Sequence, residues 1–280
     1  MSYIMEQYDG ALRTILKHGI KRGDRTGTGT LSVFGHQMRF DISDRFPIIT
    51  KRKVWPRSIF GELLWLLSGS SDNNDLLEMG VKFWSPWVDE KFEKKHGFAH
   101  GEFGPVYGFQ LRHFGGDYKT KSGGTDQLAW LMNEIETNPT SRRLLINYWN
   151  PNQLDQMKLP PCHYTFQVYI DDEGRMSGML TQRSADYPIG IPANIQFYSA
   201  FIYMLAQQTG YTPHQFIHNT GDTHIYLDQI EAVEEYLARP KVDSPRLKLN
   251  KASDIYSYKL DDFELVDYNP NPPIKIPVSV

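Results

Sequence analysis

The chemistry of this chain centres on Cys162, its only cysteine, which stands in the segment Leu159-Pro-Pro-Cys-His163. The two prolines before it remove two backbone donors and fix two φ angles, so the segment is stiff and unsuited to the middle of a helix. A stiff turn can hold a thiolate nucleophile in place, with His163 beside it. A lone cysteine can equally be a small buried hydrophobic residue, and Cys162 taken by itself favours that interpretation.

Arginines in turns and at strand edges provide a second chemical signal. Each stands beside a serine, threonine or glycine, a setting in which arginine binds phosphate through two parallel hydrogen bonds. Taken singly, each could be a surface charge. Near Cys162, such a cluster would lower the pKa of the thiol and raise its thiolate fraction. These residues are Arg25, Arg142, Arg143 and Arg183, with Ser184 as a further hydroxyl.

A single carboxylate, Glu62, interrupts the apolar segment 58–67, whose composition predicts a buried helix. A lone acid in such a segment costs free energy unless it is hydrogen-bonded or functional. The alternative is that this face of the helix reaches solvent, and the segment alone does not decide between the two.

Composition places the chain among ordinary globular proteins. It has 280 residues, 40% of them hydrophobic and 22% charged, and a formal net charge of -3. This suffices for one domain with a full core and gives no sign of a nucleic-acid or membrane surface. One cysteine excludes a disulfide framework or a multi-cysteine zinc site and is typical of a reducing compartment. Without a secretory signal or a bilayer-spanning apolar stretch, we expect a soluble, cytoplasmic protein with no metal.

The elements that must position these residues follow from periodicity and turn signals. Residues 164–170 and 176–181 alternate like two strands around the turn 171–174, and 197–210 predicts a central apolar helix. We expect a polar surface insertion at 91–102, a tight turn at 104–108 and a polar turn at 220–226. Without a repeat or a linker, we expect one domain spanning 1–280. The remaining predictions are helices at 8–19, 126–136 and up to 237, and strands at 31–40 and 144–149.

Seven motifs together resemble the thymidylate synthase family, in its order and spacing, over nearly the whole chain. They are Asp24-Arg-Thr-Gly-Thr-Gly-Thr30, Glu62-Leu-Leu-Trp65, Gly104-Pro-Val-Tyr-Gly108, Ser141-Arg-Arg143, Pro160-Pro-Cys-His163, Gln182-Arg-Ser-Ala-Asp186 and Gly221-Asp-Thr-His-Ile-Tyr226. The resemblance implies an α/β fold of the α+β type, a single domain with a large mixed sheet flanked by helices. It also implies a homodimer in which two such sheets pack back to back.

The resemblance further implies transfer of one carbon from 5,10-methylenetetrahydrofolate to C5 of a pyrimidine nucleotide. The Cys162 thiolate would add to C6 of the ring and make C5 nucleophilic. Glu62, with His163 and His224 nearby, would supply a proton or a held water to the charge developing at O4. Tyr107 would support removal of the C5 proton and position the thiol.

Residues that resemble the family's nucleotide site imply dUMP as the substrate. Asn194 would donate to O4 and accept from N3–H of uracil, whereas the family's cytosine-modifying members carry an acid there, so we expect dUMP rather than dCMP. The partner subunit would contribute Arg142 and Arg143 to the 5′-phosphate, and His224 and Tyr226 would bind the 3′-hydroxyl. The other nucleotide contacts would be Arg25, Gln182, Arg183 and Ser184.

Residues that resemble the family's folate site imply the second ligand. Asp186 would hold the pterin ring, Trp84 would stack near the transferred carbon, and Val280 would close over the site as a lid. The other folate contacts would be Trp87, Gly190, Ala193 and Ser279.

Departures from the family pattern leave the product open. Ala193 stands where methylating members usually have phenylalanine, and the loss of that ring could admit water. Hydride from the folate gives a methyl group, whereas water gives a hydroxymethyl group, so exclusion of water separates the two products. Trp84 favours the methyl product, and Tyr187 or Phe197 could fill the space. Ser85, Thr181, the run 51–53 and Pro188 also depart from the usual residues.

We therefore predict a thymidylate synthase acting on dUMP, with dUMP hydroxymethylation as the alternative. A binding protein that kept the fold and lost catalysis is the third hypothesis, and the intact Cys162, Glu62, Tyr107 and Asn194 oppose it.

Overall fold

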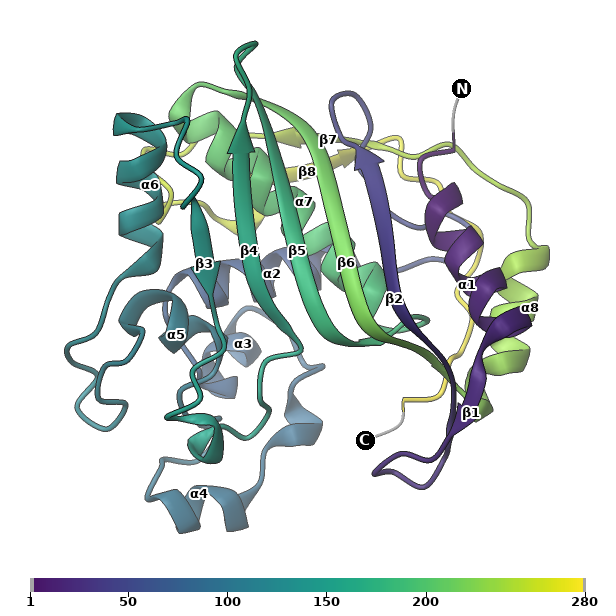
Figure 1. Cartoon of the computed structure of the whole chain (residues 1–280), viewed down its shortest axis with the longest axis horizontal. Helices are drawn as coiled ribbons and strands as arrows, with labels where there is room; N and C mark the ends of the chain where they lie inside the picture. The colour runs from purple at the N-terminus through teal and green to yellow at the C-terminus, as the bar shows by residue number, and fades with distance from the viewer. Residues whose placement is uncertain (1–2, 279–280) are drawn as a thin grey trace.

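The computed structural model describes residues 3–278 and places a six-stranded sheet at its centre (Figure 1). The strands lie in the order β1-β2-β6-β5-β4-β3, and β5 with β6 is the parallel pair among antiparallel neighbours. The predicted mixed sheet flanked by helices is confirmed. Its strands are β1 (Ile20–Arg22), β2 (Thr30–Asp41), β3 (Leu145–Asn147), β4 (His163–Ile170), β5 (Arg175–Asp186) and β6 (Thr212–Tyr226), and a separate ribbon pairs β7 (Arg246–Leu249) with β8 (Phe263–Val266).

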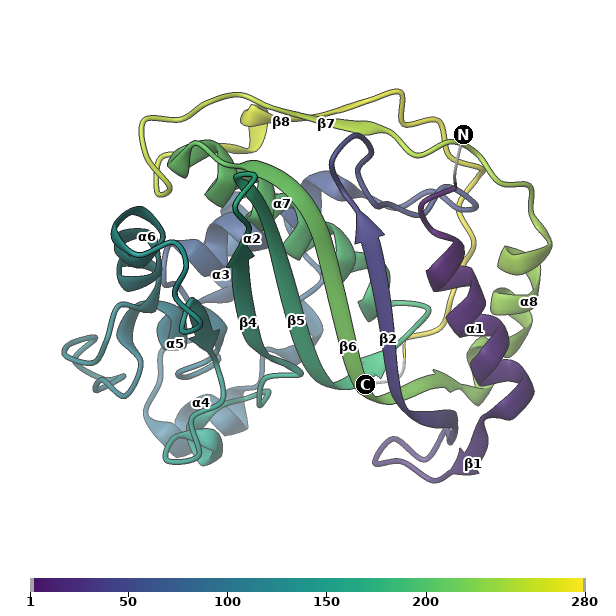
Figure 2. The ribbon, with the colours of Figure 1, turned by 45° about the horizontal axis from the view of Figure 1, so that its top comes forward.

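Helices cover one face of the sheet (Figures 1 and 2). α7 crosses behind β5 and β6, α2 packs against α7, and α1 with α8 lies beside β2. One continuous hydrophobic core fills the space between these helices and the sheet. The helices are α1 (Glu6–His18), α2 (Pro56–Leu67), α3 (Asn73–Glu78), α4 (Glu90–His96), α5 (Tyr107–His113), α6 (Gln127–Thr137), α7 (Gly190–Thr209) and α8 (Ile230–Ala238), with short 3-10 turns at Ser85–Trp87, Leu154–Gln156, Leu227–Gln229 and Leu260–Asp262.

The parallel pair β5–β6 requires a crossover connection, which α7 supplies. At Gly178 a Cβ would meet Ile202 of α7 at 2.7 Å, so glycine lets the helix approach the sheet closely. The pairing sets Ser184 opposite Asp222 and Asp186 opposite His224. Two motifs about forty positions apart in the sequence are thereby aligned at the ends of adjacent strands, where α/β sheets commonly bind ligands.

The prediction of a polar turn at 220–226 is wrong, because this segment is the second half of β6. Its polar side chains are paired inside the sheet: Thr220 and Thr223 share a hydrogen bond of 2.8 Å, and Ser32 of β2 donates to Asp222 at 2.8 Å. The internal pairing of polar groups hides the alternation that usually indicates a strand.

The predicted helix α7 begins earlier than the sequence indicates, and the helix α5 was not predicted. α7 starts at Gly190 rather than near 197, since a proline such as Pro192 is tolerated in the first turn of a helix. The expected turn at 104–108 leads directly into α5, which starts at Tyr107. Both starts place a predicted site residue, Asn194 or Tyr107, on a rigid helix rather than on a loop.

The expected surface insertion at 91–102 contains α4 and is exposed or half-buried along most of its length. Asp89 caps the helix by accepting hydrogen bonds from the backbone N–H groups of Lys91 and Phe92. Glu93 is buried and accepts from the backbone N–H of Gly101 at 2.9 Å. That contact lies within the segment, and the backbone N–H of Asn73 in α3 donates to the carbonyl of Gly101 at 2.9 Å, which attaches the segment to the rest of the fold.

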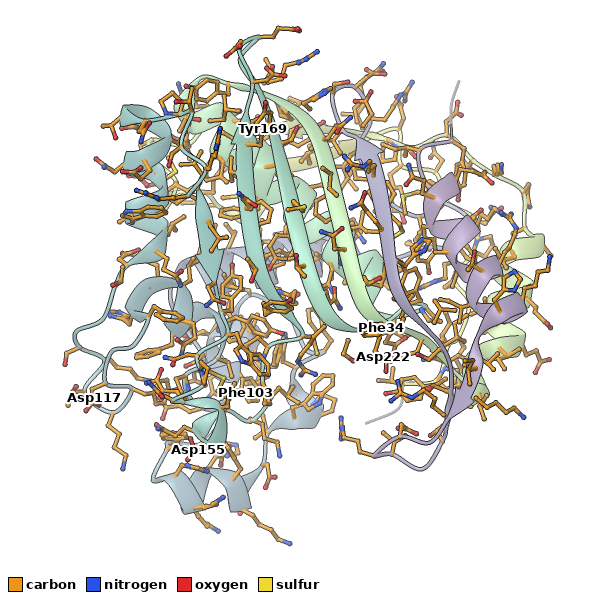
Figure 3. The ribbon with its side chains drawn as sticks, in the orientation of Figure 1. Phe34, Phe103, Asp117, Asp155, Tyr169 and Asp222 are labelled. Atoms are coloured by element: carbon orange, nitrogen blue, oxygen red, sulfur yellow. The ribbon has the colours of Figure 1, made fainter. Side chains whose placement is uncertain are left out.

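The second face of the sheet, which is turned towards the viewer in Figure 1, carries no helix from residues 3–278. Strand register lines up one row of side chains across it, and Tyr169, near the upper end of β4 in Figure 3, is exposed. In the same described range, no helix is both long and apolar enough to span a bilayer. The row consists of Leu145, Gln167, Met179, Ile217 and Arg39.

A buried ion pair holds α1 against the chain that precedes α2. The ammonium of Lys51 lies 2.9 Å from the carboxylate of Asp9, and the two side chains are 2% and 0% exposed. Lys51 also donates to the carbonyl of Leu237, and the hydroxyl of Tyr236 donates to Asp9. With three elements meeting at one buried charge pair, removal of either partner leaves a charge without compensation.

We expect Lys51→Met to lower the free energy of unfolding by about 3–5 kcal/mol, because the Asp9 carboxylate stays buried without its cation. Urea-induced unfolding measures this change. The matched control is Arg57→Ala, which breaks an ion pair with Asp261 whose side chains are 66% and 86% exposed and should cause no measurable change. Similar small effects in both variants would contradict the prediction.

Candidate active site

Cys162 lies directly before β4, in a segment that Arg183 of β5 holds from the side. The guanidinium of Arg183 donates to the carbonyls of Pro161 and Pro160 at 2.8 and 2.9 Å, and its backbone N–H donates to the carbonyl of Cys162 at 2.8 Å. The same guanidinium is 3.7 Å from the sulfur of Cys162. Arg183 therefore both shapes the stiff turn and places positive charge beside the thiol.

Tyr107 fixes the same turn from the opposite side. Its hydroxyl accepts a hydrogen bond of 2.8 Å from the backbone N–H of Cys162, and its ring stacks on His163 at 4.2 Å. The Nδ1 of His163 lies 2.6 Å from the hydroxyl of Tyr198. Burial lowers the pKa of His163 to about 3, so its imidazole is neutral at physiological pH. His163 therefore supports Tyr107 by stacking as a neutral ring against it.

The predicted lowering of the thiol pKa is not what the structure shows. Burial raises the pKa of Cys162, and the positive charges of Arg183 and Arg25 oppose this effect without overcoming it. Both arginines lower the pKa of the thiol, as predicted, but the prediction left out the larger effect of desolvation. Cys162 is partly buried, which sequence alone could not indicate.

Glu62 of α2 is directed at the indole of Trp84 rather than at bulk solvent. The indole N–H donates to the carboxylate at 2.6 Å. Burial raises the pKa of Glu62 to about 7, although the hydrogen bond from Trp84 acts in the opposite direction. The indole packs against the rings of Trp65, Phe103 and Tyr107. Glu62 is therefore poised to exchange a proton near neutral pH, as a general acid should be.

A polar network lies where β5, β6 and the first turns of α7 meet. The Oε1 of Gln182 is 2.9 Å from the Nδ2 of Asn194 and 2.9 Å from the Nε2 of His218. The Nε2 of Gln182 donates to the carbonyl of Ser184 at 2.8 Å. Sequence reasoning found Gln182, Asn194 and Ser184 but missed His218, because no local pattern marks a histidine inside a strand.

The expected pterin and ribose residues gather at the paired ends of β5 and β6. Asp186 accepts from the backbone N–H of Ile189 at 3.2 Å and from the amide of Gln229 at 3.4 Å, and burial raises its pKa. His224 contacts Asp222 at 3.1 Å and packs its ring edge-on against Tyr226 at 5.3 Å. Figure 3 labels Asp222 at this lower end of the sheet.

The C-terminal segment approaches the same corner. Gln229, which contacts Asp186, also donates to the carbonyl of Pro277 at 3.0 Å. Gly190 opens α7 next to Asp186, and a Cβ there would meet only the Cβ of Asp186, at 4.0 Å. Packing within the protein therefore does not require glycine at 190. The predicted contacts Ser279 and Val280 lie outside the described residues.

A cavity of about 380 Å³ opens beside Ala193. Tyr187 stacks on Tyr8 at 6.0 Å and Phe197 packs on Tyr198 at 4.9 Å, and neither lines the cavity. The proposed compensation by these two rings is therefore wrong. Trp87 instead packs against Trp84, at 5.9 Å. The cavity lining is mostly apolar with two cations: Arg52, Val54, Trp55, Ser58, Ile59, Gly80, Lys82, Phe83, Ile189, Pro192, Ala193 and Gln196.

Arg142 and Arg143 lie far from Cys162 within one chain. They directly precede Leu144 and β3, and the carbonyl of Leu144 accepts a hydrogen bond from the backbone N–H of Val168 in β4. Val168 is six residues further along the chain than Cys162, so the arginines lie beside β4 at that distance from the thiol. At about 3.4 Å per strand residue this is roughly 20 Å. Arg25 lies in the loop between β1 and β2, and its charge reaches Cys162. The predicted phosphate residues therefore form two separate groups in the single chain.

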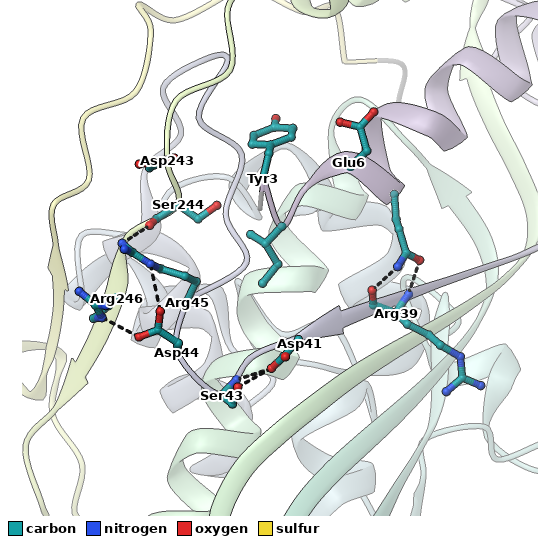
Figure 4. A pocket seen from close by; sticks show the side chains of 12 residues that line it. Tyr3, Glu6, Arg39, Asp41, Ser43, Asp44, Arg45, Asp243, Ser244 and Arg246 are labelled. Atoms are coloured by element: carbon teal, nitrogen blue, oxygen red, sulfur yellow. Dashed lines mark hydrogen bonds and ion pairs between the residues drawn. The ribbon is translucent and has the colours of Figure 1, made fainter. Parts of the chain in front are cut away.

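A second hollow, of about 600 Å³, lies between the start of α1, the end of β2 and residues 243–246 (Figure 4). Its lining carries charges of both signs, and Asp44 pairs with Arg45 at 3.3 Å and with Arg246 at 2.9 Å. It contains none of the predicted site residues. Among residues 3–278, no group of three or more His, Cys, Asp or Glu side chains is arranged to hold a metal ion.

We expect Glu62→Gln to change how stability depends on pH. The folded-state pKa of about 7 exceeds the usual 4.5, so wild-type stability should fall as pH rises between these values, while glutamine stays neutral. The variant should gain up to about 3 kcal/mol relative to wild type between about pH 5 and 8. Urea unfolding across that range measures the difference, and a constant difference would contradict the prediction.

Comparison with known families gives a match over nearly the whole chain. A family model described as thymidylate synthase matches residues 6–280, which include every site residue placed above. The match extends over more than nine-tenths of the chain, including the mixed sheet, the Cys162 turn and α7 with Asn194. The chain therefore belongs to the thymidylate synthase family.

Proposed function

We propose that this one-carbon transferase methylates dUMP at C5 to form dTMP, with Cys162 as the nucleophile. The observation that carries the proposal is the position of Cys162. Its backbone is fixed by Tyr107 and Arg183, and its sulfur lies 3.7 Å from the Arg183 guanidinium. Such a contact stabilises the thiolate once the proton has left. A reduced thiol is essential here, so the proposal places the enzyme in a reducing compartment such as the cytoplasm.

The side chains around Cys162 match the steps that addition to uracil requires. The sulfur forms a bond to C6, the C5–C6 double bond opens, and negative charge moves to O4. Glu62, whose pKa is raised by burial to about 7, can supply a proton towards O4 directly or through water. Asn194, held by Gln182, would present the rest of its amide to the base edge, and Tyr107 would position the thiol through its hydrogen bond to the Cys162 backbone.

The cavity beside Ala193 has the character that 5,10-methylenetetrahydrofolate requires. Its walls are largely apolar, with aromatic side chains at Trp55 and Phe83 and cations at Arg52 and Lys82, and the folate combines ring systems with carboxylates. When bound, methylenetetrahydrofolate supplies the one-carbon unit and, for a methyl product, the hydride. Asp186, which accepts from the backbone N–H of Ile189 in the cavity wall, would hold the pterin.

Two observations favour different products. Trp84 is fixed by its hydrogen bond to Glu62 and by surrounding rings, and a rigid indole there excludes water and favours methylation. The open space beside Ala193 favours access of water and therefore hydroxymethylation of dUMP, which is the second candidate. We favour methylation because Trp84 stands directly beside Glu62 and Tyr107, whereas the cavity does not include any of these three.

A homodimer would complete the phosphate site. Arg142 and Arg143 lie roughly 20 Å from Cys162 in their own chain, as the strand spacing shows. The helix-free face of the sheet carries exposed apolar side chains, including Leu145 and Tyr169. Packing of two such faces back to back would cover them and bring the partner's arginines towards the phosphate.

The product assay tests the chemistry. We expect the purified protein, given dUMP and methylenetetrahydrofolate, to form dTMP and stoichiometric dihydrofolate, measured by mass spectrometry and absorbance. Cys162→Ala should abolish turnover, because no adduct at C6 can form. Ala193→Phe, which narrows the cavity beside the bound folate without filling it, should suppress any hydroxymethyl product and leave the methyl product. A hydroxymethyl product without dihydrofolate from the wild type would contradict methylation and support the second candidate.

Mixed dimers test the contribution of the partner. Cys162→Ala and the double variant Arg142→Ala/Arg143→Ala should each be inactive or strongly impaired. After subunit exchange at equal amounts, random pairing should restore roughly a quarter of wild-type activity, because one site of each mixed dimer has an intact cysteine and intact partner arginines. If the arginines act within their own chain, no intact site forms and activity should not recover.

A further inference from the structure

The side-chain amide of Gln182 lies at the centre of a buried network with a defined direction. Gln182 is 3% exposed, and its Nε2 donates to the backbone carbonyl of Ser184 at 2.8 Å. A carbonyl can only accept, so this contact fixes which end of the amide is nitrogen. The Oε1 must then face Asn194 and His218, each at 2.9 Å.

His218 must act as a donor in this network. An amide oxygen cannot donate, so the Nε2 of His218 carries the proton. The Nδ1 of His218 is buried without a hydrogen-bond partner, which fits this tautomer. The side chain is 0% exposed, and burial lowers its pKa to about 3, so the ring is neutral and keeps one donor.

The same contact restricts Asn194. Its Nδ2 donates to the Oε1 of Gln182, which leaves the second N–H and the Oδ1 for a ligand. A rotated amide would set the Oδ1 against the Oε1 of Gln182, with no proton between two acceptors. That arrangement would replace a hydrogen bond with a repulsive contact between two acceptor oxygens and is therefore disfavoured.

The restriction matters because a freely rotating amide cannot distinguish the two pyrimidines. Uracil presents an acceptor at O4 and a donor at N3, whereas cytosine presents a donor at N4 and an acceptor at N3. In one orientation an asparagine amide complements uracil, and in the rotated orientation it complements cytosine. Asparagine alone is thus an insufficient basis for selectivity.

We propose that His218, acting through Gln182, is a positioning residue that fixes the amide orientation of Asn194 and so makes the site selective for uracil over cytosine nucleotides. This inference rests on the proposed dUMP site but not on the product that is formed there. Two contacts keep the Oε1 of Gln182 turned towards Asn194: the Nε2–H of His218 donates to this oxygen, and the Nε2 of Gln182 donates to the carbonyl of Ser184.

The matched variants are His218→Gln and His218→Asn. A glutamine places its amide nitrogen where the Nε2 of histidine lies, whereas an asparagine reaches only to the position of the Nδ1. His218→Leu, which removes both polar atoms, is a second loss variant in case His218→Asn does not fold. Circular dichroism and thermal unfolding report whether each variant is folded.

Isothermal titration of each protein with dUMP and with dCMP, in the absence of folate, gives the ratio of the two dissociation constants. We expect His218→Asn and His218→Leu to lower the preference for dUMP by about tenfold or more, the scale of an unsatisfied buried acceptor. His218→Gln should keep the wild-type ratio.

An unchanged ratio in folded His218→Asn or His218→Leu would overturn the inference, as would an equal loss in His218→Gln, because the histidine would then only fill space. Failure of the wild-type protein to bind dUMP would instead contradict the proposed function. The two failures are distinguishable because the first leaves dUMP binding by the wild type intact.

Discussion

The parallel pairing of β5 with β6 is the constraint on which the site depends. Parallel neighbours need a long crossover, and α7 supplies it by passing over the helix-covered face of the sheet. The start of α7 therefore lies at the ends of β5 and β6, and Asn194 is delivered to the strand that carries Gln182. The same register aligns Asp186 with His224. Antiparallel pairing of β5 and β6 would separate these groups.

Burial, more than charge, sets the protonation of the site. It raises the pKa of Cys162 despite two nearby arginines, raises that of Glu62 to about 7, and lowers those of His163 and His218 to about 3. The result is a largely neutral set of side chains arranged by hydrogen bonds. Charge that develops during reaction would then be stabilised by oriented donors with little screening by water, which makes the exclusion of water decisive for the product.

Arg183 shows how one side chain can link fold and chemistry. Its guanidinium donates to the carbonyls of Pro160 and Pro161, whose residues lack the N–H that pairing in a sheet would use. The same group lies beside the sulfur of Cys162. No helix among residues 3–278 covers the second face of the sheet. In the proposed homodimer, a second chain would cover this face and bring its Arg142 and Arg143 towards the phosphate site.

Sequence by itself determined the family and the strands 164–170 and 176–181, and it singled out Cys162 and Asn194, because these depend on residue type, order and local alternation. Tertiary structure alone decided that 220–226 is a strand, that the space beside Ala193 stays open, that Arg142 lies far from the thiol, and that His218 contacts Gln182. The sign of the Cys162 pKa shift was also decided there. Register, burial and cavity volume arise from contacts between segments distant in the chain, and no local pattern encodes them.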